Sequence, residues 1–388
     1  MANRINLNQT SYHGAGAIEE IANEAKAHGF KKAFVCSDPD LVKFHVTSKV
    51  TDILEKNGLA YELYSDIKPN PTIENVQHGV QAFKNSGADY LIAIGGGSSM
   101  DTSKAIGIII ANPEFEDVRS LEGTAPTKKP CVPIIAVPTT AGTAAEVTIN
   151  YVITDVERKR KFVCVDPHDM PIIAVIDPEM MSSMPKGLTA STGMDALTHA
   201  VEAYIGNSTT IDTRRDALKA VKLIFENIDI AYEHGDNIHA RRNMLHASFY
   251  AGCAFTKSYV GYVHAVAHSL GGKYNIPHGL ANATILPMVL EDYGSTIYKK
   301  LYQLAVYAGI ADESDDHAVA ADKFISAIKD MKEYFQIGDT FSEIQKEDIP
   351  ELSRYADKEA NPLYPVPVLM NAKELEKYYY MLMPEEEK

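Results

Sequence analysis

The 388-residue sequence predicts an α/β N-terminal half, built as a doubly wound parallel sheet, and an all-α C-terminal half. Up to about residue 176, short apolar runs alternate with segments of helical periodicity, which is typical of parallel α/β sheets. Beyond residue 186, strand-like runs become scarce and helical patterns follow one another. Because a chain of this length exceeds one ordinary core, we expect two domains, residues 1–185 and 186–388.

The expected elements follow from apolar periodicity and from Gly and Pro boundaries. Strands are expected at Ala33–Cys36, Ala60–Tyr64, Tyr90–Ile94, Ile134–Val137 and Ile172–Ile176. Helices of the first half are expected at Ala17–His28, Leu41–Asn57, Pro71–Asn85 and Thr102–Ile110. Helices of the second half are expected at Leu188–Tyr204, Thr213–Ile228, Ala240–Phe255, Val263–Gly271, Ile297–Ala308, Ala318–Tyr334 and Lys373–Met383. The run Tyr90–Ile94 is continuously apolar, as in a strand covered on both faces.

Composition excludes several classes of partner. The net charge of -15 argues against nucleic acid and anionic membrane surfaces as partners. The four cysteines lie far apart without a C-x-x-C pair, which favours reduced thiols over a disulfide scaffold. No signal-peptide core and no run of about 18 apolar residues is present. We therefore expect a cytoplasmic protein that does not bind membranes.

A glycine-rich turn follows the strand Tyr90–Ile94. Gly95, Gly96 and Gly97 precede Ser98 and Asp101, where a helix is expected to begin. Such a turn lets a bulky anion approach the backbone, and a helix N-terminus offers free N–H groups to a pyrophosphate. The turn is not G-x-G-x-x-G, and glycine also joins strands to helices for steric reasons alone, so both interpretations stand.

Two further stretches bear on a dinucleotide. The segment after Ile134–Val137 places Thr139, Thr140 and Thr143 where hydroxyl groups can line a nucleotide or simply cap a helix. Asp38 follows the strand Ala33–Cys36, at the sheet edge where ligands of open α/β sheets bind. A carboxylate there can hold ribose hydroxyls and repel a 2′-phosphate, which favours NAD over NADP. Asp38-Pro39 also makes an ordinary turn.

The segment between residues 192 and 282 carries the spacing of a metal site. Asp195 and His199 lie four residues apart, as do His264 and His268, and such pairs share one face of a helix. His278 follows a proline at which a helix can restart. One carboxylate and several imidazoles can converge on a divalent cation. Spacing does not decide which three of the four histidines bind, because one of them can contact the substrate instead.

Taken together, these motifs resemble the iron-containing (group III) alcohol dehydrogenase family over almost the whole chain. The motifs are Gly95–Asp101, Pro138–Glu146, Gly193–His199 and His264–Gly271 followed by His278-Gly279. The resemblance implies a fold like that of dehydroquinate synthase, with a dinucleotide-binding domain and a helical metal-binding domain. Two stretches depart from the family pattern. Ser269 stands where proline is usual, and the segment Asn361–Val368 resembles the tail of members with broader specificity.

The resemblance implies a role for each matching position. Asp195, His199, His264 and His278 would bind Fe(II), with Zn(II) as the other candidate, and His268 would be the catalytic histidine beside the metal. NAD would be bound by Asp38, Asn70, Gly96, Gly97, Ser98, Asp101, Thr139, Thr140, Thr143 and Lys161. Asn150, Val152 and Phe255 would line the substrate pocket.

The function implied is the NAD-linked interconversion of short aldehydes and primary alcohols or diols, with lactaldehyde and 1,2-propanediol as the expected pair. The alternatives are a broader alcohol or 1,3-propanediol dehydrogenase, or, more distantly, a lyase of the dehydroquinate synthase type. A phosphate-holding lyase needs basic residues, and only Lys257 and Lys273 lie near the ligand segment. Family members are commonly homodimers or larger, so a homo-oligomer is expected.

Overall fold

The computed structural model describes residues 5–385. The chain divides into two compact units. Unit 1 comprises the residues up to Arg158, Phe162–Met184 and His234–Leu245, and unit 2 comprises Lys159–Lys161, Pro185–Glu233 and the residues from His246 onward. The domain boundary expected between residues 185 and 186 stays a prediction.

Unit 1 is organised around a six-stranded sheet with the order β1-β8-β5-β4-β2-β3. Its strands are β1 (Thr10–His13), β2 (Lys32–Cys36), β3 (Ala60–Tyr64), β4 (Tyr90–Gly95), β5 (Ile134–Pro138) and β8 (Ile173–Ile176). All five pairings are parallel. The continuously apolar run after Asp89 is β4, between β5 and β2, and every residue of it is buried. The predicted doubly wound α/β class is therefore confirmed.

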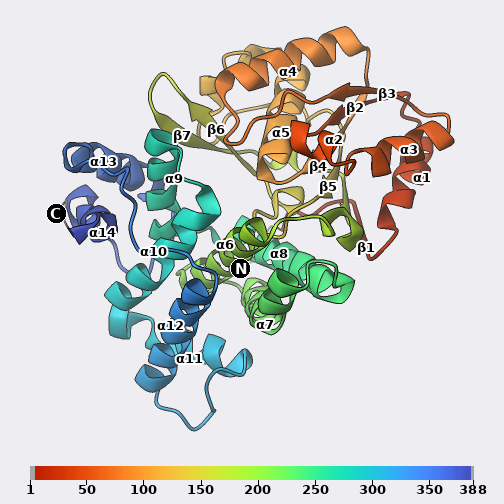
Figure 1. Ribbon diagram of the computed structural model, residues 1–388. Helices are drawn as coiled ribbons and strands as arrows, with labels where there is room; N and C mark the ends of the chain where they lie inside the picture. Colours follow the sequence, from red (N-terminus) through yellow and green to blue (C-terminus); the bar gives the residue numbers. More distant parts are fainter. Residues whose placement is uncertain (1–4, 386–388) are drawn as a thin grey trace. The chain divides into compact units, whose positions relative to one another are not determined.

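Side chains alternate between the two faces along each strand, so apolar side chains lie on both faces of this sheet. Helices cover both faces. They are α1 (Glu20–Ala27), α3 (Ser48–Lys56), α4 (Ile73–Ser86) and α5 (Gly97–Ala111). Phe34 and Leu91 point to the face covered by α4 and α5, and both side chains are fully buried there. Val35 and Ile92 point to the opposite face, which α1 and α3 cover. Figure 1 labels these helices around the strands.

The single helix expected at Leu41–Asn57 is wrong. The structure has two helices, α2 (Pro39–Lys43) and α3, separated by His45 in a left-handed conformation with φ 59°. Val46 N–H donates to Leu41 O at 2.9 Å, so the first helix closes with a left-handed C-terminal turn. The apolar periodicity continues across the break, which explains the error. A two-stranded sheet of β6 (Asn150–Asp155) and β7 (Arg160–Val165) was also not expected.

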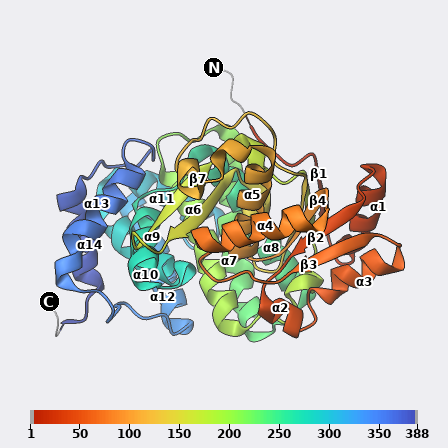
Figure 2. The ribbon, with the colours of Figure 1, turned by 90° about the horizontal axis from the view of Figure 1, so that it is seen from above.

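The long helices after residue 185 confirm the predicted helical C-terminal half. They are α6 (Lys186–Ile205), α7 (Ile211–Glu233), α8 (Ile238–Ser258), α9 (Tyr262–Tyr274), α10 (His278–Tyr293), α11 (Tyr298–Tyr307), α12 (His317–Tyr334), α13 (Ile349–Ala360) and α14 (Ala372–Leu382). Within unit 2, α6 packs against α7 and α10, and α13 packs against α9 and α14. Figure 2 shows α13 and α14 side by side. No described helix combines the length and the apolar character that a membrane span requires.

Candidate metal and cofactor sites

Helix α6 supplies two of the predicted metal ligands from one buried face. Asp195 and His199 are separated by one helical turn, and their side chains are 2% and 6% exposed. His264, from the first turn of α9, lies opposite them. Asp195 Oδ1 is 3.8 Å from His199 Nδ1 and 3.7 Å from His264 Nε2. One ligand atom from each of these three residues lies within 4.8 Å of the others.

The fourth predicted ligand, His278, begins α10 directly after Pro277. Its Nε2 atom lies 3.5 Å from Asp195 Oδ1, and its ring centroid is 5.3 Å from that of His264. Asn282, one turn later, donates its side-chain N–H to Asp195 Oδ1 at 2.7 Å and lies 3.1 Å from His278 Nε2. Unit 2 thus brings the four predicted ligands together, and Asn282 joins them although the sequence analysis did not single it out.

The chemistry of this cluster fits a divalent transition metal. His264 Nε2, which faces Asp195, is buried and has no hydrogen-bond partner within the described part of the chain. Buried polar atoms without a partner cost free energy, which a bound cation can offset. Burial lowers the pKa of the His264 and His278 imidazoles well below the ordinary value, and so does the neighbouring His268. Both rings are therefore neutral near pH 7, the form that binds metals.

Glu202 is a buried carboxylate behind this cluster. It lies on α6, one turn beyond His199, and its Oε2 atom lies 2.6 Å from His264 Nδ1, within hydrogen-bond distance. Its Oε1 atom accepts from Val263 N–H, at the N-terminus of α9, at 2.9 Å. Burial raises the pKa of Glu202 to about 7, although the N–H groups at the start of α9 oppose this rise. Because Glu202 occupies Nδ1 of His264, Nε2, which faces Asp195, is left to bind a metal.

His268 and Phe255 flank the four ligands. The His268 ring stacks on that of His278, with centroids 5.0 Å apart and an interplanar angle of 17°. The Nδ1 atom of His268 lies 2.7 Å from Oε1 of Glu359, so a carboxylate is its hydrogen-bond partner. Phe255 stacks on His199 with centroids 4.2 Å apart. Of the three predicted substrate-lining residues, Phe255 lies in unit 2, whereas Asn150 and Val152 lie in unit 1.

In unit 1, the glycine-rich turn packs closely against the threonine-rich loop. Gly96 is the N-cap of α5, which begins at Gly97. A Cβ atom at Gly97 would lie 2.9 Å from Thr143 Cγ2, and one at Gly96 would lie 3.1 Å from Thr140 Oγ1. Larger residues would therefore fill the space between the loops. The free N–H groups of the first turn and the nearby hydroxyls fit a pyrophosphate.

Two residues expected to bind the cofactor also have structural partners. Asp38 is the N-cap of α2, and its Oδ1 atom accepts from Leu41 N–H at 2.9 Å. Asp101 Oδ2 accepts from Val152 N–H at 3.1 Å, which links α5 to β6. Each carboxylate therefore has a local role beside any role in binding NAD.

The other predicted cofactor residues lie at separate places. Ser98 lies in the first turn of α5, and Thr139 N–H donates to Gly95 O at 3.0 Å, so both belong to the paired loops. Asn70 has a left-handed backbone, with φ 53°. Lys161 belongs to unit 2, where its Nζ atom would be 2.9 Å from a Cβ atom at Gly271. The structure therefore gathers the glycine and threonine positions, whereas Lys161 lies beside α9.

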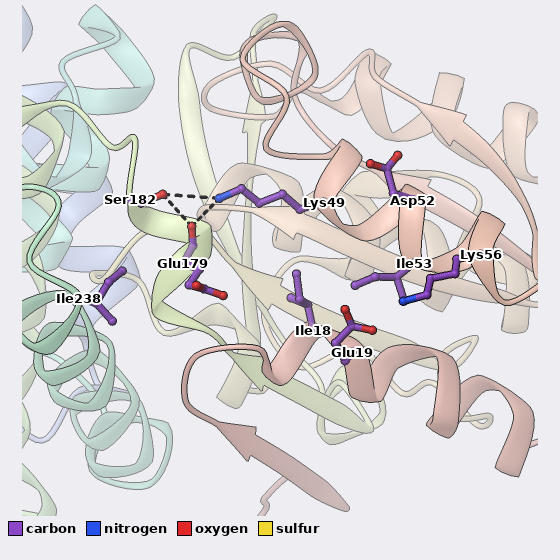
Figure 3. Close-up of a pocket in the computed structure, with 9 residues that line it drawn as sticks. All are labelled: Ile18, Glu19, Lys49, Asp52, Ile53, Lys56, Glu179, Ser182 and Ile238. Atoms are coloured by element: carbon purple, nitrogen blue, oxygen red, sulfur yellow. Dashed lines mark hydrogen bonds between the residues drawn. The ribbon is translucent and has the colours of Figure 1, made fainter.

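A surface pocket of unit 1, drawn in Figure 3, contains none of the predicted site residues. It has a volume of about 490 Å³, and its lining mixes acidic and basic side chains, including Glu19, Asp52 and Lys56. The Lys49 ammonium donates to Glu179 O at 2.7 Å, so this positive group already has a backbone partner. We assign no function to this pocket.

A parallel α/β sheet with a glycine-rich turn, together with a helical unit that clusters one aspartate and three histidines, fits the class of enzymes that bind a dinucleotide and a metal ion. Known proteins identify the family within that class. Residues 8–178 match the family described as iron-containing alcohol dehydrogenase, and residues 189–383 match the C-terminal part of the Fe-containing alcohol dehydrogenase family. The chain belongs to the iron-containing alcohol dehydrogenase family, as its motifs predicted, and it is an alcohol or diol oxidoreductase of that family.

Three relatives illustrate the similarity. The chain is 47% identical to lactaldehyde reductase of Escherichia coli K12 over 358 residues, which is 92% of this chain and 93% of that protein. A crystal structure of 1,3-propanediol oxidoreductase matches with a TM-score of 0.93 and 34% identity, over 99% of this chain and 100% of that one. Sulfoacetaldehyde reductase from Bifidobacterium kashiwanohense, solved in complex with NAD+, matches with a TM-score of 0.85 and 28% identity, over 99% of this chain and 100% of that one.

Proposed function

We propose that this chain is an NAD-dependent and iron-dependent reductase of short aldehydes, which interconverts lactaldehyde and 1,2-propanediol. The observation that carries the proposal is the buried cluster of Asp195, His199 and His264, with His278 beside it. The similarity to lactaldehyde reductase over nine-tenths of the chain supports the choice of substrate. A 1,3-propanediol dehydrogenase is the second candidate, because the solved 1,3-propanediol oxidoreductase has nearly the same fold.

The proposed ligands are one carboxylate and three imidazoles. Fe(II) or Zn(II) held there would polarise the carbonyl oxygen of the aldehyde and stabilise the negative charge that develops on it. Glu202 fixes the orientation of His264 through the bond to Nδ1, and Asn282 holds Asp195. The protein thereby prepares a donor set before any metal arrives, which reduces the ordering that binding requires.

The cofactor contributes the hydride, and unit 1 contributes the binding surface for it. The paired loops at Gly96, Gly97, Thr140 and Thr143 would receive the pyrophosphate at the start of α5. We propose that His268, whose ring stacks on that of His278, exchanges a proton with the substrate oxygen or with solvent. Phe255, stacked on His199, would form an apolar wall beside the reacting carbon.

The test of this function is the absorbance of NADH during turnover by anaerobically purified protein of known metal content. A panel of lactaldehyde, propanal, 3-hydroxypropanal and sulfoacetaldehyde should rank lactaldehyde first by kcat/KM. A higher value for 3-hydroxypropanal would favour the second candidate. Absence of NADH oxidation with every aldehyde, in protein loaded with iron, would contradict the proposal. Turnover of a phosphorylated substrate without net NADH use would indicate the lyase instead.

We expect a preference for NADH over NADPH, because Asp38 would repel the 2′-phosphate by an amount on the order of 1–4 kcal/mol. Asp38→Asn removes the charge and keeps an acceptor for the N-cap of α2. This variant should narrow the ratio of kcat/KM values for NADH and NADPH while the melting temperature stays nearly constant. Asp40→Asn, on the same helix, is the matched control and should leave the ratio unchanged. Equal kcat/KM values for both cofactors in the unmodified protein would rule out this role of Asp38.

If the native metal is Fe(II), air should inactivate the enzyme slowly while the protein stays folded. The proposed ligands include no thiol, so oxidation of a ligand cysteine cannot account for such a loss. Anaerobic Fe(II) with a reductant should then restore activity without refolding, with an unchanged circular dichroism spectrum throughout. Full stability in air, with stoichiometric zinc and high turnover, would show that zinc is the working metal.

We also propose that the enzyme works in the cytoplasm and assembles as a homodimer or larger homo-oligomer. The four cysteines are free thiols in the structure, which suits a reducing compartment. Strand β1 lies at one edge of the sheet, where a second copy could extend the pairing. Light scattering during gel filtration measures the mass of the assembly and therefore gives the number of subunits.

A further inference from the structure

Glu359 contacts the proposed catalytic histidine, although 91 residues separate the two in the sequence. The His268 side chain is 8% exposed, and its Nδ1 atom lies 2.7 Å from Glu359 Oε1. Glu359 lies in the last turn of α13. The same Oε1 atom accepts a hydrogen bond from the Tyr364 hydroxyl at 2.9 Å. The carboxylate is thus held between the imidazole and a phenol.

Several contacts within unit 2 fix α13 relative to α9, and therefore fix Glu359 relative to His268. Ser269, the neighbour of His268, shares a hydrogen bond of 2.7 Å with the Tyr379 hydroxyl of α14. Tyr379 in turn donates to Leu352 O of α13 at 3.2 Å. Ser269 is also the position at which the sequence departs from the family's usual proline, which has no hydroxyl to make this bond.

The segment after α13 is tied to the start of α9 as well. The Tyr262 hydroxyl donates to Asn361 Oδ1 at 3.0 Å, and Asn361 Nδ2 donates to Met370 O at 2.8 Å. Met370 N–H donates back to the Tyr262 hydroxyl at 2.9 Å. These bonds enclose the segment whose sequence resembles the tail of broader-specificity members. Glu359 and Tyr364 therefore belong to a tail that is anchored at both ends.

We propose that Glu359 is a positioning residue for His268, an inference that rests on the proposed function of that histidine. An ionised carboxylate can only accept hydrogen bonds, so Nδ1 of His268 must be the donor. A neutral imidazole has one N–H group, and Nε2 is therefore the unprotonated atom. Glu359 fixes both the tautomer and the plane of the ring, and it leaves Nε2 as the atom that exchanges the substrate proton. Tyr364 holds the carboxylate in place.

The test compares Glu359→Ala, Glu359→Gln, His268→Ala and the double variant His268→Ala/Glu359→Ala. Loss of a general acid–base group costs roughly 10²–10⁴-fold in rate, and we expect kcat of His268→Ala to fall in that range. Glu359→Ala should lower kcat by roughly 10–100-fold, as the loss of an orienting partner of a histidine does. The aldehyde KM and the metal content should stay unchanged. Glu359→Gln keeps an acceptor for Nδ1–H and should recover most of the lost rate.

A double-mutant cycle separates positioning from a merely structural role. If Glu359 acts through His268, Glu359→Ala should cost nothing further once His268 is absent. Multiplying losses in the double variant, or metal loss in Glu359→Gln, would overturn the proposal. Tyr364→Phe is the matched control, because it removes one donor to the carboxylate and leaves Glu359 in place. It should have a smaller effect on kcat than Glu359→Ala.

A spectroscopic readout keeps the inference testable without turnover. In protein labelled with ¹⁵N-histidine, the resonances that disappear in His268→Ala belong to His268. Their shifts should report a proton on Nδ1 in the unmodified protein and a mixture of tautomers in Glu359→Ala. A proton on Nε2 in the unmodified protein would refute the inference even if the enzyme is active. Conversely, the Nδ1–H tautomer in a protein without NADH-linked turnover would contradict the proposed function and leave the orientation by Glu359 intact.

Discussion

Replacing His264 or His278 by alanine is expected to abolish tight metal binding, whereas His268→Ala is expected to keep it. His264 Nε2 is buried without a hydrogen-bond partner among the described residues, and the Nε2 atoms of His264 and His278 lie 3.7 Å and 3.5 Å from Asp195 Oδ1. The Nδ1 atom of His268 is instead bonded to Glu359. Loss of an outer partner of a metal ligand costs about 10–100-fold in affinity, and loss of the ligand itself should cost more.

Metal content after anaerobic gel filtration, together with the rate of NADH oxidation, checks this prediction. The first two variants should lack both metal and activity, while His268→Ala should retain stoichiometric metal and lose turnover. Full metal retention in both His264→Ala and His278→Ala would refute the ligand assignment. Metal loss in His268→Ala, as in His264→Ala, would mean that the roles of these two histidines are exchanged.

Gly279→Ala is expected to damage both the stability of unit 2 and its metal site. Gly279 is the second residue of α10, and a Cβ atom there would lie 2.8 Å from the carbonyl carbon of Ser191 in α6. Backbone atoms cannot move aside as a flexible side chain does, so the two helices must separate. Overpacking of this kind costs roughly 1–3 kcal/mol. The separation would occur between His278 and Asp195, so metal affinity should fall together with the free energy of unfolding.

Gly187→Ala provides the matched control, because it makes the same chemical change in the first turn of α6, where a Cβ atom would meet nothing within 4 Å. Alanine favours a helix by about 1 kcal/mol over glycine, so this variant should be neutral or slightly stabilised. Chemical denaturation and metal titration of both variants measure the two effects. An unchanged metal affinity in Gly279→Ala would show that the contact between α6 and α10 does not position His278.

The sequence predicted the sheet and most helices because their apolar periodicity reflects burial directly. The continuous run Tyr90–Ile94 became the buried strand β4. The join between α2 and α3 was missed because it depends on the left-handed backbone of His45, which the apolar pattern does not reveal. Helix α13 was missed since its polar composition hides the buried positions Ile349, Leu352 and Ala356. These three positions are spaced by three and four residues, so helical periodicity alone could have revealed them.

In the site, too, local spacing reveals some residues, whereas others are brought together only by tertiary packing. Helical spacing grouped Asp195 with His199, and it could also have pointed to Glu202 and to Asn282, which lie one turn beyond His199 and His278 respectively. No spacing could reveal Glu359, because its contact with His268 depends on how α13 packs against α9. The residue assignments made from family resemblance, Lys161 and Asn70 among them, stay predictions.

In unit 2, the single side chain of Glu202 contacts two separate structural features. The same carboxylate binds the backbone at the start of α9 and the imidazole of His264. A substitution of this carboxylate that changes the affinity for the metal must also change the stability of the first turn of α9. Affinity for the metal and thermal stability are therefore coupled at this position. Asn282, within α10, contacts the cluster through Asp195, so a substitution there would act on the cluster without changing the start of α9.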